Sequence, residues 1–181
     1  MTDPDMGYWI YGYDANGNLN SQKDAKNQTI LFTYDALNRI TKKDYPGGTD
    51  VLYYYDETTS TNYKGRLTTV TDTSGTEKFY YDKLGRTIKT VKTIDAVDYT
   101  TETTYDSLGR IETIKYPDNT PIKYEYDAGG NLYQIRNVST GVVYATYSNN
   151  NAIGQVGRID YGNGVYTQYQ YYLTNNRLYT Q

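Results

Sequence analysis

A short motif that recurs along the chain constrains its fold more than any other feature of the 181 residues. The motif reads Tyr, Asp, two variable residues, Gly or Asn, Arg or Asn, and then an aliphatic residue or Thr. In chain order its eight copies occupy residues 13–19, 34–40, 55–67, 81–87, 105–111, 126–132, 147–159 and 172–178. The third and seventh copies carry six extra residues, and the eighth copy is degenerate. Such a repeat predicts one supersecondary unit that is stacked many times.

The spacing of the copies itself repeats after four units. Counted at the second residue of the motif, the first three copies recur 92 residues later and the fourth recurs 91 residues later. The six-residue insertion also recurs in the third copy of each block. We infer a tandem duplication of a four-unit block. The sequence therefore predicts a single domain over residues 1–181, with about eight units and no separate second domain.

The motif has the chemistry of a hairpin turn. Asp at the second position can accept backbone N–H groups across the turn, and Gly or Asn at the fifth position suits a positive φ. Residues before the turn alternate with a period of two, as in Tyr124-Glu125-Tyr126, and other turns such as Ser74-Gly75 lie between the motifs. Each repeat is thus two strands and two turns. We predict an all-β fold of about 16 strands, a continuous antiparallel ribbon of tandem β-hairpins that coils into a spiral or partial shell.

Composition limits both the packing of this ribbon and the chemistry that it can carry. The chain has 25 Tyr, whereas Leu, Ile, Val and Phe together number 32, so Tyr must replace aliphatic residues in a thin, aromatic and partly hydrated core. The chain lacks Cys and His, which excludes disulfides, thiolate or imidazole metal sites, and Cys or His nucleophiles. The net charge of −3 argues against nucleic-acid binding. No apolar run is long enough for membrane insertion, and no signal peptide is visible in this chain.

No catalytic constellation or metal site is visible in the sequence. Residues 14–18 resemble the start of a calcium loop, but Ala25 stands where the bidentate Glu should be. Five Glu on predicted strands could meet in space, although a solvated face is the commoner arrangement: Glu57, Glu77, Glu102, Glu112 and Glu125. We therefore expect no enzyme activity, no catalytic residue, no metal and no cofactor.

The residues singled out by the sequence are those of the motif, and we expect structural roles for them. Asp and Arg of one copy could form an ion pair at every turn. The two vary independently, however, because Asp14 is followed by Asn18, and Arg158 occurs where Ser148 replaces Asp. This favours separate roles, in which Asp closes its turn and Arg stacks on neighbouring rings. The predicted structural residues are Tyr13, Asp14, Gly17, Tyr34, Asp35, Arg39, Tyr55, Asp56, Gly65, Arg66, Tyr81, Asp82, Gly85, Arg86, Tyr105, Asp106, Gly109, Arg110, Tyr126, Asp127, Gly130, Gly157, Arg158 and Arg177.

The repeat resembles the YD repeat of Rhs proteins, most closely at residues 105–111 and 65–72, and the resemblance extends over residues 8–181. The family includes bacterial polymorphic toxins, shell-forming components of insecticidal toxin complexes, cell-wall-associated Rhs proteins and the teneurins of animals. The resemblance implies a spiralling β-ribbon that winds into a hollow shell around a toxic C-terminal segment. Family shells end in an Asp-Pro-x-Gly-Leu type signature at which toxin-bearing members are cut. This chain has only Asp3-Pro4, so the resemblance carries over neither self-cleavage nor a toxin.

On this basis we expect a non-enzymatic structural segment of an Rhs-type shell that encloses a toxin or other cargo polypeptide. Its partners would be the rest of the parent shell and the enclosed chain. As part of a larger bacterial protein, it would be secreted or exposed at the cell surface. The alternative is a carbohydrate-binding or adhesin module that binds glycans through rows of exposed Tyr. Unpaired strands at both ends of the ribbon could also allow edge-to-edge self-association.

Overall fold

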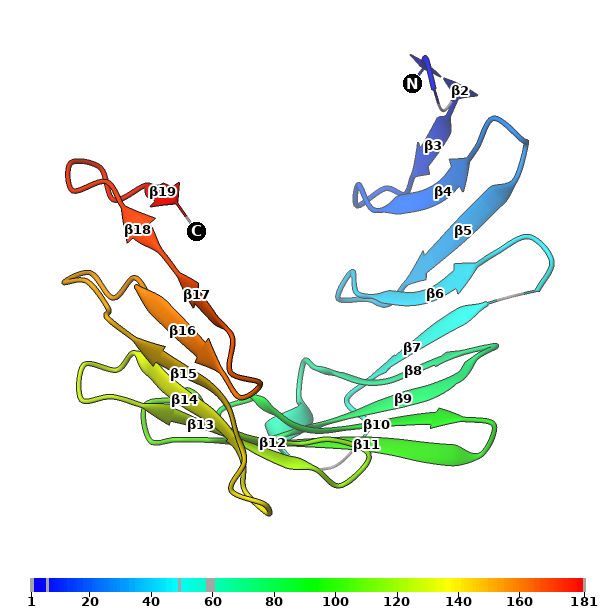
Figure 1. Cartoon of the computed structure of the whole chain (residues 1–181). Coiled ribbons are helices and arrows are strands. Elements are labelled where there is room, and N and C mark those ends of the chain that lie inside the picture. Colours follow the sequence, from blue (N-terminus) through cyan, green and yellow to red (C-terminus); the bar gives the residue numbers. More distant parts are fainter. Residues whose placement is uncertain (1, 6, 49, 58–60, 181) are drawn as a thin grey trace. The chain divides into compact units, whose positions relative to one another are not determined.

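The computed structural model describes residues 2–5, 7–48, 50–57 and 61–180, and its regular structure is almost entirely β-strand (Figure 1). The strands are β1 (Thr2–Asp3), β2 (Gly7–Tyr8), β3 (Ile10–Tyr13), β4 (Leu19–Lys23), β5 (Thr29–Tyr34), β6 (Ile40–Asp44), β7 (Val51–Tyr55), β8 (Leu67–Asp72), β9 (Gly75–Tyr81), β10 (Thr87–Ile94), β11 (Val97–Tyr105), β12 (Ile111–Lys115), β13 (Pro121–Tyr126), β14 (Leu132–Asn137), β15 (Val143–Ser148), β16 (Arg158–Tyr161), β17 (Tyr166–Gln168), β18 (Gln170–Tyr171) and β19 (Leu178–Thr180). A short 3-10 helix, η1 (Thr61–Tyr63), lies between β7 and β8. Within the described ranges, no helix is long and apolar enough to cross a membrane.

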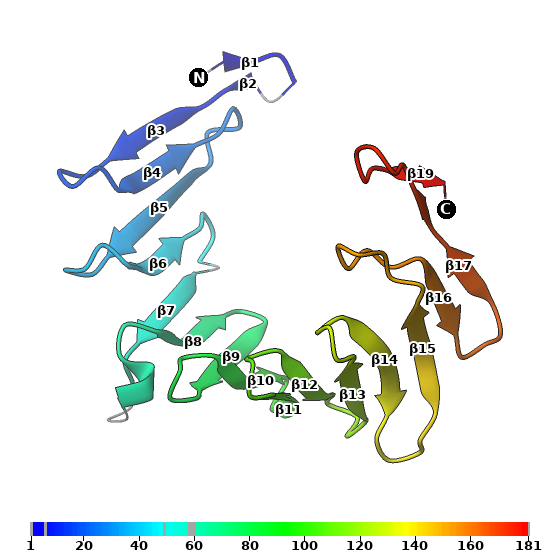
Figure 2. The ribbon, with the colours of Figure 1, turned by 90° about the vertical axis from the view of Figure 1, so that its left-hand side faces the viewer.

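Fifteen strands form one sheet whose order follows the chain from β3 to β17. Adjacent strands in the sheet are therefore consecutive in sequence, and the pairings are antiparallel, as in β4 with β5 and β12 with β13. Two small sheets, β1 with β2 and β18 with β19, lie outside this order. The all-β fold and the antiparallel ribbon of consecutive hairpins are thus confirmed (Figure 2).

The chain divides into two compact units, Met1–Thr100 and Thr101–Gln181. The division falls just before Tyr105, the first residue of the second four-unit block. Each unit consists of a single layer of strands whose connecting turns alternate between its two edges (Figure 2). The single domain over residues 1–181 stays a prediction.

A one-residue bulge marks the motif turns. In the hairpin of β5 and β6, Thr33 pairs with Lys42 and Tyr34 pairs with Ile40, so that Thr41 is the extra residue. The same shift occurs beside the motif Tyr in five more hairpins, where the extra residues are Asn20, Thr68, Ile88, Glu112 and Tyr133. Hairpin loops of more than two residues often end in a residue with positive φ and are followed by such a bulge. The bulge changes the direction of the extra residue's side chain.

The predicted thin core is present, but its most buried residues are not aromatic. In the described part of the chain, the buried apolar residues are Ile122 and Ala145, and the buried polar residues are Thr68, Thr69 and Asn137. No large side chain among them is fully buried. A single layer of strands has no second layer to cover a ring, and among the described residues no Tyr side chain is fully buried.

The φ angles confirm the turn geometry that was predicted for the fifth motif position. Gly17, Asn38 and Gly85 have φ of +84°, +59° and +78°. Gly109, Gly130 and Asn176 also have positive φ. A turn that the sequence did not indicate lies between β10 and β11, where Asp95 and Ala96 have φ of +49° and +62°. That turn contains no Gly, Pro or Asn to signal it.

Candidate functional site

The motif Asp closes its turn with both carboxylate oxygens. Asp106 Oδ1 accepts the backbone N–H groups of Leu108 and Arg110, each at 2.9 Å. Its Oδ2 accepts Nε–H of the Arg110 side chain at 2.7 Å. Asp35 and Asp82 make the same three hydrogen bonds in their turns. The Asp is therefore the acceptor that satisfies the loop backbone and orients the following Arg.

The prediction of separate roles for Asp and Arg is wrong in three turns. Arg39, Arg86 and Arg110 each form an ion pair with the Asp of their own turn, at 2.7 Å. The independent variation in sequence misled because Asn can replace Arg in this contact. The side-chain amide of Asn18 donates to Asp14 Oδ2 at 2.9 Å, and Asn131 donates to Asp127 in the same way.

The motif Tyr of four copies links its repeat to the preceding one. Tyr126 donates its hydroxyl hydrogen to the carbonyl oxygen of Ile111 at 2.8 Å, and Ile111 directly follows the motif turn of the preceding unit. Tyr34, Tyr55 and Tyr81 make the equivalent bond to Leu19, Ile40 and Leu67, at 2.7–2.9 Å. We call these bonds tyrosine links. The guanidinium carbon of Arg110 also lies 4.0 Å from the ring centre of Tyr126, and Arg39 covers Tyr55 at 4.2 Å, as predicted for stacking Arg.

Side chains of successive turns also contact each other directly. Arg39 Nη1 donates to Asp56 Oδ2 at 2.8 Å, and this joins the second turn to the third. Asn18 donates to Asn38 Oδ1 at 2.8 Å, and Arg110 Nη1 donates to the Gly130 carbonyl oxygen at 3.2 Å. We call this series of contacts between turns the turn ladder. Together with the tyrosine links, it joins neighbouring repeats within each compact unit.

The two insertions differ from each other. The one after Asp56 contains η1, and the Arg66 Nε–H there donates to the Asn62 carbonyl oxygen at 3.1 Å instead of to an Asp. The insertion after Ser148 contains a complete turn of the motif type, which was not predicted from the sequence. In it Asn151 Oδ1 accepts the backbone N–H groups of Ile153 and Gln155, at 3.2 and 3.0 Å.

The eighth unit also differs from its predicted alignment. The tyrosine link is made by Tyr171, which donates to the Val156 carbonyl oxygen at 3.0 Å, and not by Tyr172. The loop is one residue longer, since Tyr172 N–H donates to the Arg177 carbonyl oxygen.

In the seventh copy, Arg158 pairs with Asp160 at 2.6 Å, and Gly157 N–H donates to the Ser148 carbonyl oxygen at 3.2 Å.

The turn carboxylates have lowered pKa values. The Asn18 side-chain hydrogen bond lowers the pKa of Asp14, and the Arg39 backbone N–H lowers the pKa of Asp35. The hydrogen bond from the Arg39 side chain lowers the pKa of Asp56 in the next turn. These groups are more acidic in the folded chain than the ordinary Asp value of 3.8. Their contribution to stability is therefore fully present above that value and is lost as the pH falls through the lowered pKa values.

We expect the urea midpoint of unfolding to stay constant from neutral pH to about pH 5 and to fall steeply below about pH 4. The double variant Asp35→Asn, Asp56→Asn should show a shallower fall, because Asn does not titrate. Urea titrations of both proteins across this pH range measure the difference. Identical acid profiles would contradict a role of these carboxylates in acid stability.

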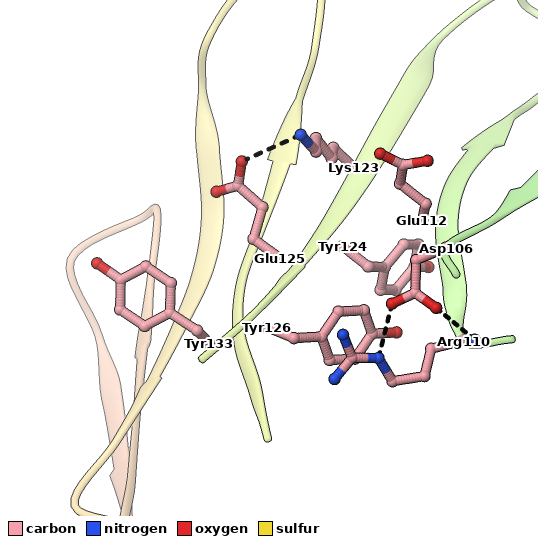
Figure 3. Close-up of a pocket in the computed structure, with 8 residues that line it drawn as sticks. All are labelled: Asp106, Arg110, Glu112, Lys123, Tyr124, Glu125, Tyr126 and Tyr133. Atoms are coloured by element: carbon pink, nitrogen blue, oxygen red, sulfur yellow. Dashed lines mark hydrogen bonds and ion pairs between the residues drawn. The ribbon is translucent and has the colours of Figure 1, made fainter. Parts of the chain in front are cut away.

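Beside the turn ladder, the compact unit Thr101–Gln181 has an open groove of about 440 Å³ between β12, β13 and β14 (Figure 3). Its charged lining consists of three carboxylates and two cations: Asp106, Glu112, Glu125, Arg110 and Lys123. The rings of Tyr124, Tyr126 and Tyr133 complete the lining. Glu112 and Glu125, two of the five Glu noted in the sequence, thus meet at one groove. In the described ranges, however, no three acidic side chains are grouped as a metal site would need.

These observations define a class of protein, a tandem β-hairpin repeat with hydrogen bonds between successive units. Residues 13–50 match the family model described as RHS Repeat. The match confirms the resemblance to the Rhs/YD repeat that the motif indicated. Comparison with curated protein sequences gives no match.

Solved structures share the fold over almost the whole chain. The crystal structure of TcdB2-TccC3 superposes with a TM-score of 0.81 at 19% identity, covering 98% of this chain and 10% of that chain. The TcdB2-TccC3-TEV structure gives 0.79 at 19% identity, covering 97% and 10%. TcdB2-TccC3 without its hypervariable C-terminal region gives 0.61 at 17% identity, covering 95% and 11%. This chain thus spans about a tenth of the length of the chains that it matches.

Proposed function

We propose that this chain is a wall segment of an Rhs-type shell that encloses a toxin or other cargo polypeptide, and that it has no catalytic role. The tyrosine links carry the proposal. They recur at Tyr34, Tyr55, Tyr81, Tyr126 and Tyr171, and each joins a repeat to the one before it, so a wall can be extended by adding repeats without enlarging a central core. The structural match covers only 10% of the much longer TcdB2-TccC3 chain, which also supports the proposal that this chain is one segment of a larger wall.

In this role, the motif residues named in the sequence analysis are structural. Their partners are the remaining ribbon of the same shell and the polypeptide inside it. The parent would be a bacterial protein that is secreted or exposed at the cell surface. A saccharide-binding function is compatible with this role, because it would depend on side chains that the links and the ladder do not use.

Cryo-electron microscopy of the full-length protein that contains these repeats, combined with limited proteolysis, tests the proposal. We expect a hollow particle whose wall contains this ribbon, with an internal polypeptide that stays intact until the wall is unfolded. A control digestion in urea should release and cut that polypeptide. An open ribbon in which every segment is cut at the same rate would overturn the proposal.

A further inference from the structure

A pocket of about 230 Å³ lies in the compact unit Met1–Thr100, beside η1, β8 and β9. Its lining consists of one Glu, one Lys, two Thr and three aromatic residues. None of these residues takes part in a tyrosine link or in the turn ladder. The volume is smaller than the roughly 300–1,000 Å³ of sites for drug-sized ligands, so the pocket fits a small molecule. We call it the Glu57 pocket.

The bulge of β8 brings two neighbouring hydroxyl groups to one carboxylate. Thr68 is the extra residue between β7 and β8. Successive side chains of a regular strand point to opposite faces, but here Thr68 Oγ1 and Thr69 Oγ1 both donate to Oε2 of Glu57, the former at 2.8 Å. Thr68 Oγ1 also lies 3.0 Å from the Tyr54 carbonyl oxygen. Because Thr68 and Thr69 are only 4% and 8% exposed, their hydroxyl groups hold the carboxylate in one place.

The pocket presents one negative and one positive group, and both are available to a ligand. Among the residues that the structure describes, Oε1 of Glu57 has no hydrogen-bond or ion-pair partner. Lys78 pairs with Thr69 across β8 and β9, and its side chain is exposed. Within the described ranges, the Lys78 ammonium group has no partner either. Glu57 and Lys78 therefore line one pocket without forming an ion pair with each other.

Aromatic residues complete the lining. They are Tyr63 of η1 and Phe79 and Tyr80 of β9. The ring of Tyr63 lies edge-on to Tyr81, with ring centres 5.7 Å apart, and Lys89 Nζ lies 5.6 Å from the ring centre of Tyr80. Aromatic residues favour contact with an apolar side chain, and the face of a ring also attracts an ammonium group.

The two charged groups determine the class of ligand. A neutral molecule would leave both of them unpaired, and a ligand with a single charge would leave one of them unpaired. A small zwitterion can pair with both. We propose that the Glu57 pocket binds a free amino acid with an apolar side chain. The ammonium group of the amino acid donates to Oε1 of Glu57, its carboxylate accepts from Lys78, and its side chain packs against the aromatic residues.

Isothermal titration calorimetry of the whole chain with L-phenylalanine and L-leucine tests this proposal. At least one of the two amino acids should bind saturably. Its N-acetyl derivative, which lacks the ammonium group, and its amide, which lacks the carboxylate, should each bind about tenfold more weakly. These comparisons use the unaltered protein, so a folding defect cannot produce the expected difference.

Two variants assign each charge of the ligand to its partner. Glu57→Gln keeps an acceptor for the two Thr hydroxyl groups but loses the charge. It should weaken binding of the free amino acid about tenfold and leave binding of the N-acetyl derivative unchanged. Lys78→Met should weaken binding of the free amino acid by a similar factor and leave binding of the amide unchanged. The matched control is Lys26→Met, which removes an exposed Lys of the same compact unit outside the pocket and should leave every affinity unchanged.

Far-UV circular dichroism should show the same fold for all three variants. Three results would overturn the proposal: no saturable binding of either amino acid at millimolar concentration, equal binding of the amino acid and one of its two derivatives, or equal losses in Lys26→Met and Lys78→Met. None of these results affects the wall proposal, which rests on the tyrosine links.

Discussion

Replacing Tyr126 by Ala is expected to lower the free energy of unfolding by about 3 kcal/mol. The change removes the tyrosine link to the Ile111 carbonyl oxygen at 2.8 Å and the ring that Arg110 covers at 4.0 Å. It also leaves the carbonyl oxygen of Ile111 without the hydrogen bond from the Tyr126 hydroxyl group. Urea unfolding followed by circular dichroism measures the loss. Amide hydrogen exchange should locate it at β12 and β13, the strands that the link joins.

Two further variants separate the parts of this effect. Tyr126→Phe keeps the ring under Arg110 and loses only the hydroxyl group, so we expect a cost of about 1 kcal/mol. Tyr133→Ala removes a ring of similar size that makes no link, and its cost should stay within about 0.5 kcal/mol. If Tyr126→Ala cost no more than Tyr133→Ala, the motif Tyr would be a surface residue and the tyrosine links would not hold the units together.

The links explain how a ribbon with so few buried side chains can be stable. Five tyrosines contribute a hydroxyl-to-carbonyl bond to the preceding repeat, and several turns also contact the next turn. Stability then grows by nearest-neighbour contacts, as in other linear repeat proteins. In the wall proposed above, such contacts would allow the ribbon to grow by adding repeats without a filled interior.

The turns were predictable because their chemistry is local. Asp106 and Gly109 act within five residues, and the positive φ of Gly109 follows from the type of turn. The ion pair between Asp106 and Arg110 was not predicted, because other copies of the motif have Asn at the position of Arg110. The turn at Asn151 was missed because Asn and Gln replace Asp and Arg there and no Tyr directly precedes them.

The contacts between units were not predictable from residue type, because their acceptors are backbone carbonyl groups. A signal for them exists in the spacing. The hydroxyl groups of Tyr34, Tyr55 and Tyr126 all reach the carbonyl oxygen 15 residues earlier, whereas Tyr81 reaches one 14 residues earlier. The groove could not be predicted from the sequence for a related reason. Glu112 and Tyr133 are 21 positions apart, and only the register shifts of two hairpins bring both to one groove.

Gly75→Ala is expected to cost about 3–5 kcal/mol, the largest effect of any single added methyl group considered. The sequence marks Gly75 as a turn residue, but its main constraint comes from β10. A Cβ at this position would lie 1.9 Å from the Thr93 carbonyl oxygen, and the φ of +143° disfavours any side chain. Backbone atoms of β9 or β10 would have to shift, because the clashing atom is not at the end of a flexible side chain.

Gly164→Ala is the matched control for this variant. Gly164 has φ of +87°, but a Cβ there would meet nothing within 4 Å. Its cost should therefore be only the conformational one, about 1 kcal/mol. Urea unfolding of both variants measures the difference, and hydrogen exchange should show faster opening of β9 and β10 in Gly75→Ala alone. Equal costs would mean that β10 does not approach Gly75 closely, and the pairing of Thr76 with Thr93 would then have to be reassigned.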